Sequence, residues 1–80
     1  MTNHELCLPE LEIDDQPILV SLWLVRRGSR VTRGEQVLEL LAGAATVDLA
    51  APIDGVLSAV HVEEGDTLTV GQRLATFRSC

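Results

Sequence analysis

The chain has 80 residues, 46% of them hydrophobic, and a net charge of -6 from 12 acidic side chains against six arginines. This length allows one domain, residues 1–80, and excludes a multidomain organisation. The acidic balance disfavours nucleic-acid binding, because a protein that binds phosphates must present several cations to them. No stretch approaches the roughly 18 apolar residues that span a bilayer. The N-terminus has no basic, apolar leader, so we expect a cytoplasmic protein without a membrane partner.

The first elements predicted along the chain are two strands, over residues 5–8 and 18–25. Both are short, largely apolar runs bounded by turn residues. Pro9 follows the first run, where a missing N–H donor does little harm. Residues 11–17, which include Glu12, Asp14 and Asp15, are predicted to form a polar surface loop.

The rest of the chain is also predicted to form strands, over residues 36–41, 46–50, 55–62 and 73–77, with shorter bridges around Val31 and Leu68. Six glycines and three prolines cut the chain into pieces that are too short for a stable helix. The pattern therefore predicts an all-β domain.

An internal repeat relates the two halves of the chain. Residues 21–40 align without a gap with residues 58–77, at an offset of 37 residues. The identical pairs are Ser21/Ser58, Val25/Val62, Gly28/Gly65, Thr32/Thr69 and Gly34/Gly71. Two copies are too few for a solenoid. We therefore expect the halves to pack on each other about a pseudo-two-fold axis, as a flattened barrel or sandwich.

Three quoted segments resemble a known family. "LPELE", "VSLWLVRRGSRVTRGEQVLEL" and "ATVDLAAPIDGVLSAVHVEEGDTLTVGQRLATF" are similar to the lipoyl and biotinyl carrier domains over about residues 8–77. The similarity is greatest to the lipoyl domains of 2-oxo acid dehydrogenase E2 subunits. The resemblance implies a barrel-sandwich hybrid of two small antiparallel sheets. It also implies that the termini meet at one end and that a hairpin bearing the modified lysine projects from the other.

The hairpin of this chain departs from the family pattern. Where the family reads roughly Glu-Thr-Asp-Lys-Ala, the resemblance aligns Leu41, Ala42, Gly43, Ala44 and Ala45. Ala44 takes the place of the lysine, and the chain contains no lysine at all. Because the tip differs at several consecutive positions, we interpret it as natural drift rather than an engineered knock-out.

This departure has a chemical consequence. In the family, lipoate and biotin are attached through an amide to a lysine amine, which the methyl group of Ala44 cannot form. An arginine is no substitute, because its guanidinium stays protonated. The only amine is the α-amino group of Met1, which the fold implied by the resemblance holds at the opposite end. We therefore predict that the chain carries no cofactor.

Three classes of function follow. The preferred one is a degenerate lipoyl-like domain that acts as a non-catalytic interaction or accessory module. The alternative is a lipoyl or biotinyl carrier domain of an E2-type or carboxylase complex, with its site lost or mutated. An enzyme in its own right is disfavoured, because the sequence shows no convergent polar site.

The hairpin tip is the candidate contact surface. An apolar tip, made of Leu41, Ala42, Gly43, Ala44 and Ala45, would gain several kcal/mol by burying a few hundred square ångströms against a partner, at about 25 cal/mol per Å². That partner would be a second copy or a larger complex. The alternative is that Leu40 and Leu41 end a core strand and the alanines lie idle on the surface.

Other charged residues form weaker candidates. The cluster Arg26, Arg27, Arg30 and Arg33 is either a solvated loop or a docking patch for an acidic partner. The acidic turn with Glu63, Glu64 and Asp66 is interpreted as solvated.

The histidines and cysteines are predicted to have no special role. His4 and His61 have no partner at metal-ligand spacing and are interpreted as ordinary surface or strand residues. Cys7 and Cys80 do not form a metal-binding pair. They are interpreted as two reduced thiols, with a disulfide near the termini as the alternative.

Overall fold

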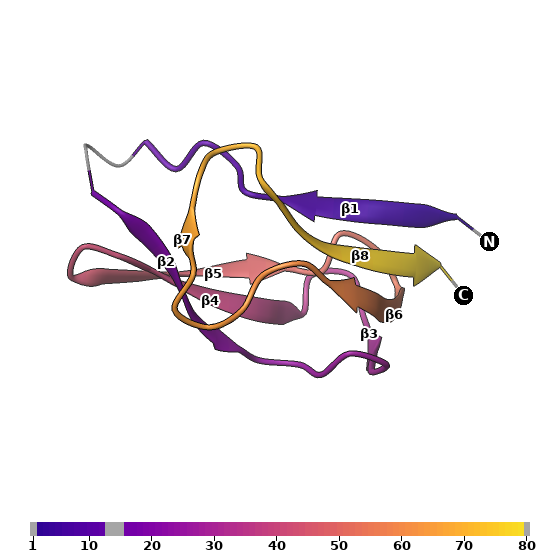
Figure 1. Ribbon diagram of the computed structural model, residues 1–80. Coiled ribbons are helices and arrows are strands. Elements are labelled where there is room, and N and C mark those ends of the chain that lie inside the picture. The colour runs from indigo at the N-terminus through magenta and orange to yellow at the C-terminus, as the bar shows by residue number, and fades with distance from the viewer. Residues whose placement is uncertain (1, 13–15, 80) are drawn as a thin grey trace.

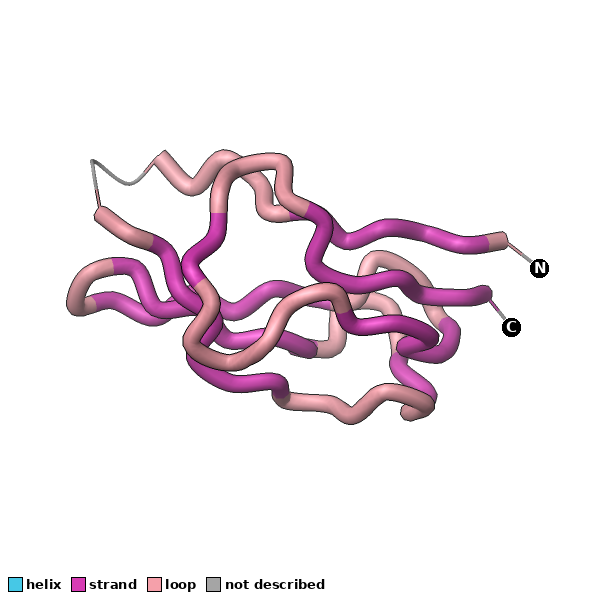
Figure 2. Tube along the Cα trace, viewed as in Figure 1, coloured by secondary structure: helices cyan, strands magenta, loops and turns pink. Residues whose placement is uncertain are grey.

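The computed structural model describes residues 2–12 and 16–79, and these residues form strands and loops without a helix (Figures 1 and 2). The strands in chain order are β1 (Asn3–Cys7), β2 (Ile18–Trp23), β3 (Arg30–Val31), β4 (Gln36–Ala42), β5 (Ala45–Ala50), β6 (Gly55–Val60), β7 (Thr67–Leu68) and β8 (Arg73–Ser79). None of the described residues belongs to a helix long and apolar enough to cross a membrane.

The strands form two four-stranded antiparallel sheets, with the order β1-β8-β6-β3 in one and β5-β4-β2-β7 in the other. The two short strands are exchanged between the halves of the chain. Strand β3 pairs with β6 of the second half, and β7 pairs with β2 of the first. Each half therefore completes the sheet of the other, which confirms the predicted all-β barrel-sandwich.

The predicted pseudo-two-fold symmetry holds at the level of single residues. Strands β2, β3 and β4 become β6, β7 and β8 when 37 is added to each of their bounds. Both β2 and β6 contain a bulge at equivalent serines, Ser21 and Ser58. The repeat in the sequence therefore corresponds to a repeat in the backbone structure.

Alternating side chains from both sheets form one core. In β4, Leu38 and Leu40 point inward with no exposed surface, while Glu39 and Leu41 are only half-buried. The equivalent inward residues of β8 include Phe77, the largest fully buried side chain. The buried core comprises Leu8, Val20, Val31, Val37, Leu38, Leu40, Leu49, Ala51, Leu57, Val62, Leu68, Leu74, Ala75 and Phe77.

The predicted strands are confirmed, with shifts at their ends. Strands β2 and β6 end at Trp23 and Val60, two residues earlier than predicted, because the chain there leaves one sheet to cross to the other. In the predicted polar loop, Leu11 packs against the core. Asp14 and Asp15 of that loop lie outside the described residues.

The termini and the β4–β5 hairpin lie at opposite ends of an elongated molecule, with principal extents of 38 × 19 × 19 Å (Figure 1). Strands β1 and β8 run side by side to the end where both termini lie. The backbone N–H of Ser79 donates to the carbonyl of Thr2 at 2.9 Å. This arrangement confirms the expectation for the two ends of the domain.

Candidate functional site at the hairpin tip

The β4–β5 hairpin closes through a two-residue turn. Ala42 pairs with Ala45, so Gly43 and Ala44 alone make the connection. Gly43 has a φ of 61°, the left-handed value that the first central residue of a type II′ turn requires. A Cβ on Gly43 would also lie 2.8 Å from Oε1 of Gln16, but that exposed side chain can move away, so the backbone conformation is the reason for glycine. Ala44 is therefore at the extreme tip of the hairpin.

The tip exposes less apolar surface than the sequence predicted. Leu40 lies in the core and Ala42 is only 4% exposed, while Leu41 is half-buried. Leu41 points away from the core and pairs with Leu19 of β2, which is also half-buried. Of the five predicted tip residues, only Gly43, Ala44 and Ala45 are exposed. Leu40 thus ends a core strand, while the role of the tip as a contact surface stays a prediction.

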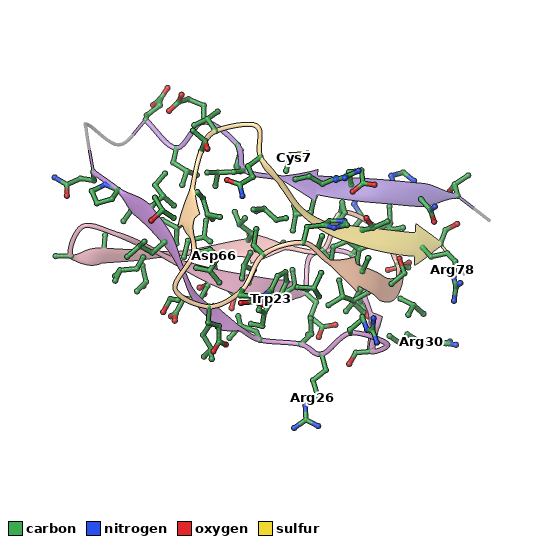
Figure 3. All side chains as sticks on the ribbon, in the orientation of Figure 1. Cys7, Trp23, Arg26, Arg30, Asp66 and Arg78 are labelled. Atoms are coloured by element: carbon green, nitrogen blue, oxygen red, sulfur yellow. The ribbon has the colours of Figure 1, made fainter. Side chains whose placement is uncertain are left out.

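The tip has no group that could form an amide with a carboxylic acid. Gly43 carries no side chain, Ala44 carries a methyl group, and the chain has no lysine. The arginines lie elsewhere: Arg26, Arg30 and Arg78 point outward from the part of the molecule away from the hairpin (Figure 3). The residues at the tip therefore do not fit a covalently attached lipoyl or biotinyl group.

A polar cluster on β1, β8 and the residue after β6 was not predicted. The hydroxyl of Thr76 donates to Oε2 of Glu5 at 2.8 Å, and it lies 2.8 Å from Nε2 of His61. His61 is 3.8 Å from the same carboxylate oxygen, and Arg73 is 3.9 Å from the other. The carboxylate near His61 was not visible in the sequence, although within the described residues it does not make a metal site. The pairing of β1 with β8 brings together residues that are far apart in sequence.

The order of groups in this cluster does not suit nucleophilic catalysis. The single hydroxyl hydrogen of Thr76 is directed at Glu5, so its oxygen accepts a hydrogen bond from His61. An activated nucleophile would instead donate its proton to the histidine. Thr76 is also only 8% exposed. We interpret the cluster as structural, because the hydrogen bond from Thr76 to Glu5 connects β8 to β1. The cluster of Glu5, His61, Arg73 and Thr76 is called the polar brace below.

No other site for chemistry forms within the described part of the chain. It contains no cavity and no group of three His, Cys, Asp or Glu residues arranged to hold a metal ion. His4 is exposed, as predicted. Cys7 is an exposed free thiol opposite Arg73, and Cys80 lies outside the described residues.

The sequence and the fold define a carrier-domain class. Residues 7–77 match the sequence model of the biotin and lipoyl family, described as "Biotin-requiring enzyme". The chain belongs to this family. The solution structure of the lipoyl domain of the 2-oxoglutarate dehydrogenase complex from Azotobacter vinelandii has the same fold, with a TM-score of 0.77 and 23% identity, over 94% of this chain and 95% of that one.

Two relatives within the class share more sequence. Both are dihydrolipoyllysine-residue succinyltransferase components of 2-oxoglutarate dehydrogenase complexes. The Bacillus subtilis protein is 36% identical over 73 residues, which are 91% of this chain and 18% of that protein. The Escherichia coli K12 protein is 30% identical over 78 residues, 98% of this chain and 19% of that protein. The chain thus spans less than a fifth of the length of these relatives.

Proposed function

We propose that this chain is a lipoyl-type domain that carries neither a lipoyl nor a biotinyl group and serves as a non-catalytic interaction module. The proposal rests on the residues found at the tip of the hairpin. The fold presents Ala44 in an exposed two-residue turn, and no lysine exists elsewhere in the chain. A scaffold of the family is thus present without the amine that its cofactors need.

The first test asks whether the chain can be modified. We expect the intact mass of the wild-type protein to stay unchanged after incubation with ATP, lipoate and a lipoate–protein ligase, and likewise with biotin and a biotin ligase. The Ala44→Lys variant is the matched comparison, because it creates the only side-chain amine in the chain. An increase in its mass would therefore map to residue 44.

The control and the contradicting outcome are both simple. The corresponding domain of the Bacillus subtilis relative, whose name includes a dihydrolipoyllysine residue, serves as the positive control for the lipoate reaction. A lipoyl or biotinyl adduct on the wild-type chain, made in vitro or purified from its source, would refute the proposal and favour the carrier alternative.

The second part of the proposal concerns the partner, which we place at the tip. The exposed backbone of Gly43, Ala44 and Ala45 permits close approach, and the half-buried pair Leu19 and Leu41 adds apolar surface beside it. We propose that this surface contacts a protein, either a second copy or a component of a larger complex.

A charge at the tip tests this contact. We expect Ala44→Asp to weaken the interaction by roughly tenfold or more, because an ionised carboxylate must lose its hydration in the interface. Oligomer size and the recovery of partners from the source organism are the readouts. Ala50→Asp, which places the same charge at an exposed position at the far end of β5, is the control. Unchanged behaviour of the tip variant would remove the contact from the proposal.

A further inference from the structure

Two loops that cross between the sheets have the same backbone structure. The first, here called the basic loop, covers residues 24–29, and the second, the acidic loop, covers residues 61–66. Gly28 and Gly65 both have a φ of 93°. Gly28 donates to the carbonyl of Leu57 at 2.7 Å, and Gly65 donates to the equivalent carbonyl of Val20 at 2.8 Å. The pseudo-two-fold axis therefore relates the two loops closely.

The side chains of these loops have opposite charges. Arg26 and Arg27 of the basic loop are equivalent to Glu63 and Glu64 of the acidic loop. Arg30, the first residue of β3, follows the basic loop directly, and Asp66 is the last residue of the acidic loop, although these two positions are not equivalent in the repeat. All six residues are exposed. Within the part of the chain that the structure describes, the ion pairs all involve Glu5, so the loops do not neutralise each other.

The two loops run in opposite directions between the sheets. The basic loop runs from β2 toward β3, and the acidic loop runs the opposite way from β6 toward β7 (Figure 1). Arg26 and Asp66 lie to either side of Trp23 (Figure 3). The charged side chains of both loops are exposed, so a partner can contact each loop.

Exposed apolar side chains lie at the start of each loop. Leu24, the first residue of the basic loop, is 41% exposed, and Val60, the residue before the acidic loop, is 37% exposed. The pseudo-equivalent of Val60 is Trp23, whose indole N–H donates to the carbonyl of Val62 at 3.2 Å and covers the acidic side. Valine is too small to cover the other side in the same way. Each loop thus begins beside an exposed apolar side chain.

We propose that this face binds a second copy of the chain in an antiparallel, two-fold arrangement. The basic loop of each copy lies on the acidic loop of the other, and Leu24 and Val60 are covered at the centre. A second copy is the partner that fits, because a two-fold contact uses one patch twice and must be self-complementary. The pseudo-symmetry meets this requirement, since it gives both loops the same shape while their charges are opposite. The contact lies away from the hairpin tip and does not depend on whether the tip is modified.

Charge exchange between the loops tests the proposal. We expect sedimentation of the 80-residue chain to show reversible dimers between about 10 µM and about 1 mM, with weaker association at about 500 mM salt than at about 50 mM. Arg26→Glu with Arg27→Glu makes both loops acidic, and Glu63→Arg with Glu64→Arg makes both basic. Each variant alone should associate roughly tenfold or more weakly than the wild type. An equimolar mixture should recover association, because every contact again joins opposite charges.

The controls separate this contact from net charge and from folding. The basic variant moves the net charge of -6 toward zero, so weaker association cannot come from general repulsion. Asp48→Arg, which makes one such charge change on the exposed side of β5, should leave dimerisation unchanged. Because Glu64 accepts a hydrogen bond from the Trp23 backbone, the pair Arg26→Glu and Glu63→Arg provides a milder exchange. Circular dichroism checks that each variant is folded.

Three outcomes would overturn the proposal: a wild-type chain that stays monomeric throughout, loop variants that associate as the wild type does, or a mixture that fails to recover association.

Discussion

At the scale of single residues, Ala44 and Thr76 show what the sequence can and cannot reveal. The position of Ala44 could be predicted, because the residues around it follow a known hairpin pattern and the structure places it in the turn. The contacts of Thr76 could not. Its partners Glu5 and His61 are 71 and 15 residues away, and only the register of β1 on β8 brings them together. No local pattern carries that information.

The brace around Thr76 leads to a prediction about stability. We expect Thr76→Val, which preserves shape and removes the hydroxyl, to lower the free energy of unfolding by about 1–3 kcal/mol. The loss arises because Glu5 and His61 both lose their hydrogen-bond partner, and only the 3.8 Å contact between them and the 3.9 Å contact of Glu5 with Arg73 remain. Urea unfolding followed by circular dichroism measures the effect. Thr46→Val, at an exposed position of β5, should change stability by less than about 0.5 kcal/mol. Equal effects of the two substitutions would show that the cluster is not a brace.

At the scale of elements, the crossing loops explain why β2 and β6 end early. Main-chain hydrogen bonds fix the path of both loops, and each path needs a glycine with positive φ. The glycine pair was visible in the sequence repeat, and so was the turn that each glycine makes. The exchange of β3 and β7 between the halves was not visible, because short strands of two residues carry too little pattern to identify their partners.

Equivalent loops should respond equally to the same substitution. A Cβ on Gly28 or Gly65 meets no atom within 4 Å, so the cost of alanine comes from the backbone alone. We expect Gly28→Ala and Gly65→Ala each to lower stability by about 1–2 kcal/mol, with nearly additive effects in the double variant. Thermal and urea unfolding provide the measurement. Clearly unequal losses would mean that side chains, rather than the shared backbone, hold the loops.

The contrast with Gly55 makes this test sharper. A Cβ on Gly55 would meet the backbone of Arg78, including its carbonyl carbon at 2.9 Å. Gly55→Ala should therefore act by forcing β6 and β8 apart, and we expect a larger loss than at either loop glycine.

At the scale of the whole molecule, the all-β class, the strand order along the chain and the symmetry of the halves could all be predicted. They follow from glycine and proline spacing and from the repeat, which act over many residues. The amount of exposed apolar surface at the hairpin could not be predicted. Whether Leu40 and Ala42 face the core depends on which side of the sheet each position takes, and this is settled only when β4 packs onto β8 and its neighbours.

The main-chain bonding of the crossing loops has a consequence for how such a domain can diverge. Main-chain hydrogen bonds hold both loops, and the carboxylates of Glu64 and Asp66 add side-chain bonds in the acidic one. Within the described residues, the side chains of Arg26 and Glu63 take part in no hydrogen bond or ion pair that holds a loop. The two halves of the repeat can therefore differ in the charge of these side chains without a change of fold. The domain thus keeps a symmetric backbone while the charge distribution of its crossing loops is asymmetric.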